Sequence, residues 1–118
     1  MGPIQSTGIF APSFPSAETE ISRNDVSDND VGIYVLGIVD YVVSDNVLRN
    51  NRLFDIVIQD GTARAERNTI AGRNVGVGVV AATEDATGIL GGNEIRNTSV
   101  APAQTIECCG FTATIISE

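Results

Sequence analysis

Carboxylates and arginines are the side chains of this 118-residue chain that could do chemistry, because its seven basic residues are all arginine and it has no histidine. A His-dependent catalytic triad and a His-containing metal site are therefore excluded. Two carboxylates facing each other across a groove could still hydrolyse a glycosidic bond, one as the acid and the other as the base. The candidates for that role are Asp25, Asp28, Asp30, Asp45 and Asp55.

The most acidic segment holds Asp25, Asp28 and Asp30 around Asn29. Carboxylates at alternating positions suit a hard cation such as Ca²⁺, which takes about six to eight oxygen ligands. The segment lacks the closing glutamate of an EF-hand loop, so a solvated acidic turn is the simpler interpretation. We expect no cofactor, and Ca²⁺ on these three aspartates is the alternative.

The only two cysteines, Cys108 and Cys109, are adjacent. A disulfide bond between neighbouring residues is geometrically difficult. Pairing with another chain, metal binding and buried thiols remain open, although two cysteines alone make no zinc site. We prefer the interpretation that both are buried thiols.

The elements that must position these residues repeat along the chain. Four segments share the pattern Asn, any residue, aliphatic, and their asparagines are spaced by 22, 22 and 25 residues: Asn24, Asn46, Asn68 and Asn93. A second alternating segment follows each of the first three, namely 32–35, 55–58 and 76–79. Internal repetition with this period is the signature of a solenoid, and the i, i+2 spacing of the aliphatic residues is that of strands.

If each repeat is one turn of a coil, equivalent residues stack about 4.8 Å apart. Apolar residues then form two continuous columns, one of Val26, Leu48, Ile70 and Ile95, the other of Ile21, Val43, Ala65 and Leu90. The asparagines form a ladder in which each amide bonds the next, and we expect each to take the left-handed conformation at its corner. One place earlier, Arg23, Asp45 and Arg67 would alternate in charge.

Local departures from the repeat give further expectations. An extra residue near Leu53 and Phe54 predicts a bulge or a wider corner. The segment 76–82 has small residues and predicts an open face that another surface could approach. The segment 101–103, with Pro102, is expected to break the next strand, whereas residues 111–115 alternate and fit a final strand.

The repeated Asn-x-aliphatic pattern with the following Gly-Ile-x-Val resembles the right-handed parallel β-helix superfamily of pectate lyases, polygalacturonases, mannuronan epimerases and phage tailspikes. The resemblance covers roughly residues 18 to 100 and implies an all-β fold, a short right-handed parallel β-helix of about four to five coils. It also implies an elimination chemistry in which an arginine base stands beside carboxylates. Asp45 with Arg23 or Arg67 comes nearest to that arrangement, but no active-site motif of the family is present.

The whole chain, 1–118, is expected to be one domain, with an N-terminal partial coil or cap over 1–20, repeats over 21–100 and a C-terminal cap or final strand over 101–118. Residues 8–10 resemble 32–34 and belong to that opening coil, with 11–20 as its outgoing loop. No apolar run is long enough for a membrane span. A net charge of −8 disfavours binding to nucleic acid or to an anionic membrane surface.

These observations favour a non-catalytic structural module that associates with itself or continues a parent chain. We expect it outside the cell or at the cell surface, although no secretory signal is visible. Two alternatives remain: a fragment or minimal form of a polysaccharide lyase or hydrolase acting on acidic polysaccharide, and a carbohydrate-binding module without turnover.

Overall fold

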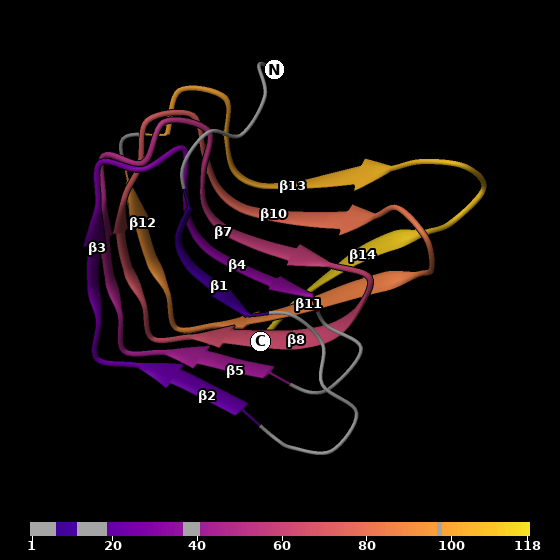
Figure 1. Cartoon of the computed structure of the whole chain (residues 1–118), viewed down its shortest axis with the longest axis horizontal. Helices are drawn as coiled ribbons and strands as arrows, with labels where there is room; N and C mark the ends of the chain where they lie inside the picture. Colours follow the sequence, from indigo (N-terminus) through magenta and orange to yellow (C-terminus); the bar gives the residue numbers. More distant parts are fainter. Residues whose placement is uncertain (1–6, 12–18, 37–40, 97) are drawn as a thin grey trace.

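The computed structural model describes residues 7–11, 19–36, 41–96 and 98–118, and all of its regular elements in these ranges are β-strands. Figure 1 shows the chain winding through three faces in turn, so that strands from successive passages lie side by side. The expected all-β fold is confirmed as a parallel β-solenoid of about four turns.

Three parallel sheets make up the faces of the coil. Sheet A consists of β1 (Thr7–Ala11), β4 (Val31–Leu36), β7 (Phe54–Gln59), β10 (Val75–Ala81) and β13 (Ala101–Glu107). Sheet B consists of β2 (Thr19–Ser22), β5 (Tyr41–Ser44), β8 (Gly61–Glu66), β11 (Ala86–Gly91) and β14 (Ala113–Ser117). Sheet C consists of β3 (Asp25–Ser27), β6 (Val47–Arg49), β9 (Thr69–Ala71) and β12 (Glu94–Arg96).

The core runs through the middle of the coil, because residues at equivalent positions point inward in every turn. Both predicted apolar columns are confirmed by the strand register, the first in sheet C and the second in sheet B. Sheet A adds a third column, in which Ile33, Ile56 and Val77 are fully buried. No single turn could bury these side chains alone, so stacking of the turns creates the core.

The extra residue of the second repeat lies at the corner between β6 and β7. Strand β7 pairs with β4 at an offset of 23 residues (Val31 with Phe54), whereas β6 pairs with β3 at an offset of 22. The main-chain N–H groups of Leu53 and Phe54 both donate to the carbonyl of Asp30, at 2.8 and 3.2 Å. The prediction of a wider corner is confirmed.

The opening partial turn is also present, because β1 pairs with β4 and Ile9 lies opposite Ile33. The expected loop over 11–20 is wrong at both ends, since Ala11 belongs to β1 and β2 begins at Thr19. Residues 1–6, 12–18, 37–40 and 97 lie outside the described part of the chain, and with them most of the predicted N-terminal cap.

The expectation that residues 101–103 break the next strand is wrong. They begin β13, which pairs along its length with β10, Ala101 lying opposite Val75. A strand at the edge of a sheet makes ladder hydrogen bonds on one side only, so it can hold a residue such as Pro102 that has no N–H. The predicted final strand is present as β14, which begins at Ala113.

Candidate functional site

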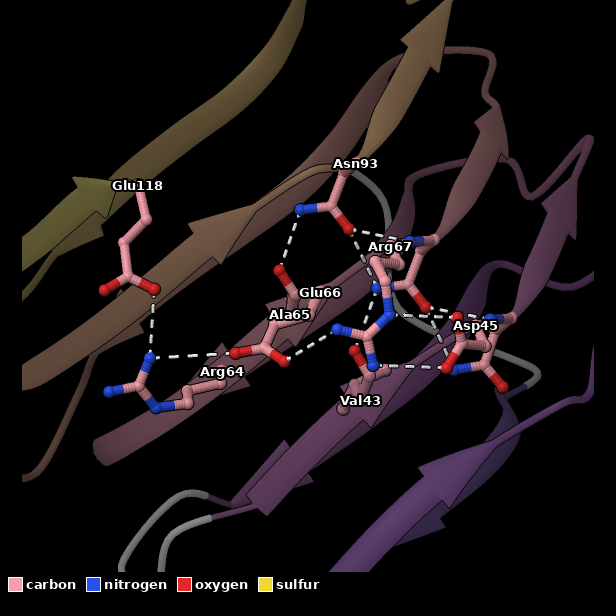
Figure 2. Close-up of polar contacts among 10 residues, drawn as sticks. Val43, Asp45, Arg64, Ala65, Glu66, Arg67, Asn93 and Glu118 are labelled. Atoms are coloured by element: carbon pink, nitrogen blue, oxygen red, sulfur yellow. Dashed lines mark hydrogen bonds and ion pairs between the residues drawn. The ribbon is translucent and has the colours of Figure 1, made fainter.

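The asparagine ladder is the longest polar feature of the coil. The main-chain N–H and the side-chain Nδ2 of Asn46 both donate to Oδ1 of Asn68, at 3.1 and 3.0 Å. Asn24 bonds Asn46 in the same way, and Asn68 bonds Asn93. The Nδ2 group of each ladder asparagine also donates to a main-chain carbonyl. Figure 2 shows this for Asn93 Nδ2, which donates to Ala65 O at 2.7 Å.

The left-handed residue at this corner is the one before each asparagine, which corrects our expectation. Arg23, Asp45, Arg67 and Gly92 have φ values of 57°, 56°, 53° and 65°. The preceding residue turns the chain, so the asparagine side chain can point along the coil to its neighbour. The turn and the ladder are therefore made by two different residues.

Arg67 and Asp45 form the ion pair that the charge alternation predicted. Arg67 Nε and Nη2 donate to the two carboxylate oxygens of Asp45 at 3.2 and 3.3 Å, and Nη1 donates to Glu66 (Figure 2). The hydrogen bonding of Arg67 to the Asp45 carboxylate raises the pKa of the Arg67 guanidinium. Among the described residues, Arg23 makes no ion pair with Asp45, so the alternation stops at one pair.

This geometry fits a link between coils better than a catalytic site. The side chains of Arg67 and Asp45 are 60% and 45% exposed, and a guanidinium that is more firmly protonated than usual is a poor base. Catalysis by Asp45, Arg23 or Arg67 stays a prediction.

The three aspartates proposed for Ca²⁺ each bond a different partner in the next coil. Asp25 accepts from Arg49 Nη2 at 2.8 and 2.9 Å, Asp28 accepts from Asn50 at 2.7 Å, and Asp30 accepts from Arg52 Nε at 2.8 Å. Within the described ranges, no group of three His, Cys, Asp or Glu side chains is placed to hold a metal ion. The structure does not bring these carboxylates together.

Asp55 is the carboxylate with the most unusual environment. In the sequence it stands out in one respect, because the equivalent position in the neighbouring repeats is a glycine. It pairs in register between Gly32 and Gly76, is fully buried, and accepts a hydrogen bond from Asn51 Nδ2 at 2.9 Å. Its Oδ2 has no hydrogen-bond partner among the described residues. Burial raises the pKa of Asp55 to about 6, against the opposing effect of the Asn51 hydrogen bond. Gly72 leaves the space that Oδ2 occupies.

A second asparagine contact, which we did not predict, holds the corner beside Asp55. Asn51 Oδ1 accepts from the main-chain N–H of Asn29 at 3.1 Å, and its Nδ2 also donates to Val26 O at 3.3 Å. The sequence does contain a repeat that could have predicted this contact, because Asn29 and Asn51 stand five residues after Asn24 and Asn46. Asn51 is fully buried, so this contact stiffens the corner from inside.

Asp60 organises the corner between sheets A and B. Burial acts to raise its pKa, but hydrogen bonds from the N–H groups of Thr83 and Ala82 and from the Thr83 hydroxyl lower it to about 2. Asp60 therefore stays charged and holds the start of the loop between β10 and β11 in place.

The two cysteines are bonded to each other and exposed, so the interpretation of buried thiols is wrong. Cys109 has a φ of 65°, and the N–H of Phe111 donates to Cys108 O at 3.1 Å. The disulfide thus lies in a tight turn after β13.

The open face predicted for residues 76–82 is closed by the chain itself. The ring of Phe54 lies over Gly78, where an added Cβ would stand 2.7 Å from two ring carbons. Val75 and Val57 join Phe54 in a second apolar cluster, separate from the main core. Beside this cluster lies a groove of about 320 Å³ that includes Asn74, Val100 and Gln104.

No described segment forms a helix long and apolar enough to cross a membrane. The chain was also compared with models of protein families, with curated proteins and with solved structures, and none of the three comparisons gave a match.

Proposed function

We propose that this chain is a non-catalytic structural module of the right-handed parallel β-helix superfamily, and that it associates with itself through the ends of its coil. One observation carries the proposal: among the described residues, strands with an open edge lie at both ends. Strands β1, β2 and β3 are the last strands of their sheets at one end, and β13, β14 and β12 at the other. Such edges are templates for further pairing.

The core supports this proposal because it reaches both ends. Ile9 packs against the main core from the first coil, and Ile95, Ala103 and Ile115 do so from the last coils. These four side chains are only partly buried. Pairing with another strand at either end would bury them further, which stabilises association by about 25 cal/mol for each Å² of apolar surface removed from water.

The ion pairs between coils support a structural role too. Arg49–Asp25, Arg52–Asp30 and Arg67–Asp45 each join one coil to the next, and in the second pair Asp30 is buried. The two exposed pairs contribute about 0–1 kcal/mol each, so they favour the register of the coils more than their stability.

Light scattering coupled to size-exclusion chromatography tests the proposal. We expect the mass to rise above that of one 12.4 kDa chain as concentration increases. A constant single-chain mass up to millimolar concentration would contradict self-association. Electron microscopy of the concentrated sample then shows whether the particles grow along the coil axis.

A pair of variants on β1 separates the coil end from the outer surface. Ile9→Lys places a charge on the core side of an edge strand and should abolish the concentration dependence. Phe10→Lys is the matched control, because Phe10 is 57% exposed on the same strand. We expect Phe10→Lys to associate like the original chain, and circular dichroism of both variants checks that they are folded.

Carbohydrate binding without turnover is the second candidate function, and one observation favours it. Phe10 stands edge-on to Tyr34, with ring centroids 5.5 Å apart, and Phe10 is exposed. Exposed aromatic rings with a hydroxyl group nearby suit the apolar face and the hydroxyls of a sugar. A glycan array distinguishes this candidate, since specific binding should disappear in Phe10→Ala.

A location outside the cell or at its surface belongs to the same proposal. The disulfide between Cys108 and Cys109 supports it, because disulfides persist in oxidising compartments. Thiol alkylation of the protein taken from its native source, before any reduction, should leave both cysteines unlabelled.

A further inference from the structure

The turn between β13 and β14 holds a disulfide that joins two neighbouring residues, Cys108 and Cys109. A disulfide stabilises a fold mainly by closing a loop of the unfolded chain, and this effect grows with the length of the loop. No residue lies between these two cysteines, so their bond links no distant parts of the coil. The fold therefore gains little from this bond.

Other contacts hold the turn without the sulfur atoms. The main-chain N–H of Cys108 donates to Ala81 O at 3.0 Å, and that of Phe111 donates to Cys108 O at 3.1 Å. Further along, the N–H of Thr112 donates to Asp85 Oδ1 at 2.8 Å. The coil can therefore keep its fold whether the two cysteines are bonded to each other or reduced.

Molecules in solution can reach the pair, because both cysteines are exposed. Cys109 stands two places after β13, as Thr83 stands two places after β10, and the last residues of these strands pair in register. The turn after β13 lies on the corner that holds Thr83, where the Ala86 N–H donates to Thr112 O at 3.0 Å (Figure 1). Thr83 is nevertheless exposed. Access to Cys109 is therefore a property of this corner and not of its place in the last turn.

Carboxylates surround the turn. Glu107 immediately precedes Cys108, Glu84 and Asp85 lie in the corner below, and all three are exposed. Hydrogen bonds to the main chain of the turn hold Glu107 and Asp85 there. A negatively charged reagent is repelled from such a place, whereas a positive charge is attracted. The net charge of −8 on the chain acts in the same direction.

We propose that the Cys108–Cys109 pair is a site of reversible thiol–disulfide exchange whose substrates are thiols that carry a positive charge. A thiolate attacks one sulfur of the pair and forms a new S–S bond with it, while the Cys108–Cys109 bond breaks and the other cysteine leaves with the electron pair as a thiolate. A second thiolate then attacks the mixed disulfide, which releases the oxidised substrate and leaves both cysteines reduced. This activity does not depend on self-association of the chain.

Short thiols of the same length test the proposal, because their thiolates differ in net charge: cysteamine, mercaptoethanol and mercaptoethanesulfonate. Each is added to the folded full chain at neutral pH and low salt, and intact mass after acid quenching and alkylation gives the mixed disulfide and the dithiol. Each rate is divided by that of the same thiol with an uncharged small disulfide, which removes differences in intrinsic nucleophilicity. We expect cysteamine to react at least about fivefold faster than mercaptoethanesulfonate, with mercaptoethanol between them and a smaller difference at high salt.

Two variants show whether the acidic corner sets this order. Glu84→Gln removes one of its carboxylates and should narrow the difference between the cationic and anionic thiols. Glu20→Gln is the matched control, because it makes the same change at an exposed residue of β2, at the opposite end of sheet B, and should leave the difference unchanged. Circular dichroism of the reduced and alkylated chain should still show the strand signal of the oxidised chain.

Absence of a mixed disulfide with every thiol would overturn the inference, and so would equal normalised rates for the three thiols at low salt. Loss of the strand signal on reduction would also overturn it, because the disulfide would then be a structural bond. The same holds if non-reducing electrophoresis shows the cysteines bonded between two chains. Exchange in the expected order supports the inference whether or not the chain self-associates.

Discussion

At the scale of single residues, the coil depends on polar side chains that lie inside it. Asn46, Asn51, Asn68 and Asp55 are buried, and the asparagines satisfy main-chain groups that would otherwise have no partner in the corners. Asp55 differs from them, because one of its oxygens has no partner among the described residues. A buried group of this kind costs stability whenever it is charged.

Stability should depend on pH through Asp55. The pKa of this carboxyl is about 6 in the folded chain and 3.8 for a freely solvated aspartate, so the folded chain binds the proton more tightly between those values. The free energy of unfolding therefore falls as pH rises from about 4 to about 6, by roughly 3 kcal/mol at 1.36 kcal/mol per pKa unit. Urea unfolding at closely spaced pH values measures this slope.

Asp55→Asn serves as the control for that slope, because it keeps the carbonyl oxygen that Asn51 bonds and cannot ionise. The difference in the free energy of unfolding between Asp55→Asn and the original chain should vary between pH 4 and 6 and then level off. Asp60 acts in the opposite direction, since its lowered pKa contributes stability that is lost as pH falls from 3.8 toward 2. A difference that is constant with pH would show that Asp55 is charged in the folded chain.

Removing a central member of the ladder should be costly. Asn68→Ala removes the partner of the Asn46 N–H, one of the two acceptors of Asn46 Nδ2, which still bonds Ile21 O, and the donor to the carbonyl of Val43, at about 1–3 kcal/mol for each group left buried without its partner. We expect a loss of about 3–6 kcal/mol in the free energy of unfolding, measured in urea. Asn24→Ala, at the half-buried end of the ladder, should cost only about 1 kcal/mol. Equal losses for Asn68→Ala and Asn24→Ala would contradict the expectation that the central asparagine matters more.

At the scale of elements, strand β10 shows how a small residue in one turn accommodates a large one in another. Phe54 of β7 lies over Gly78 of β10, which pairs in register with Val57. The glycine-rich sequence of β10 is therefore a requirement of packing within the chain.

Gly78→Ala should destabilise the chain by about 1–3 kcal/mol, because its Cβ would meet the Phe54 ring at 2.7 Å and force it aside. Gly91→Ala in β11 is the matched control, since the nearest atoms to its Cβ belong to Glu118 at 3.7 and 3.8 Å. Thermal unfolding of both variants checks this expectation. Equal midpoints would mean that the Phe54 ring moves without cost.

At the scale of the whole molecule, stability should differ between the middle of the coil and its C-terminal end. Each turn is held by the turns next to it, so a terminal turn has only one neighbour. Strand β7 lies between two strands and nearly all of its residues are buried, whereas β13 is an edge strand whose residues are partly or fully exposed.

Hydrogen exchange should therefore proceed from the C-terminal end. Amides of β13 and β14 are expected to exchange at least about tenfold faster than those of β7 and β8 at neutral pH, as measured by mass spectrometry of peptic fragments. Uniform exchange along the coil would indicate that all turns open together.

The sequence by itself determined the period, the strand spacing, both apolar columns, the ladder and the wider corner at Leu53. These features could be predicted because the alternation of side chains is local and every turn repeats it, so four weak signals support one another. The pairing of Asp45 with Arg67 follows in the same way, from one residue standing above another.

Only the tertiary structure decided the rest. Whether Asp55 is buried, whether Phe54 closes the face over Gly78, and whether Pro102 can lie in a strand depend on what the neighbouring turn or sheet edge offers, and that is not written at the residue itself. The same holds for Asp25, Asp28 and Asp30, whose partners lie one turn away. Burial and hydrogen-bond satisfaction are properties of the stacked coil, so a single repeat carries too little information to predict them.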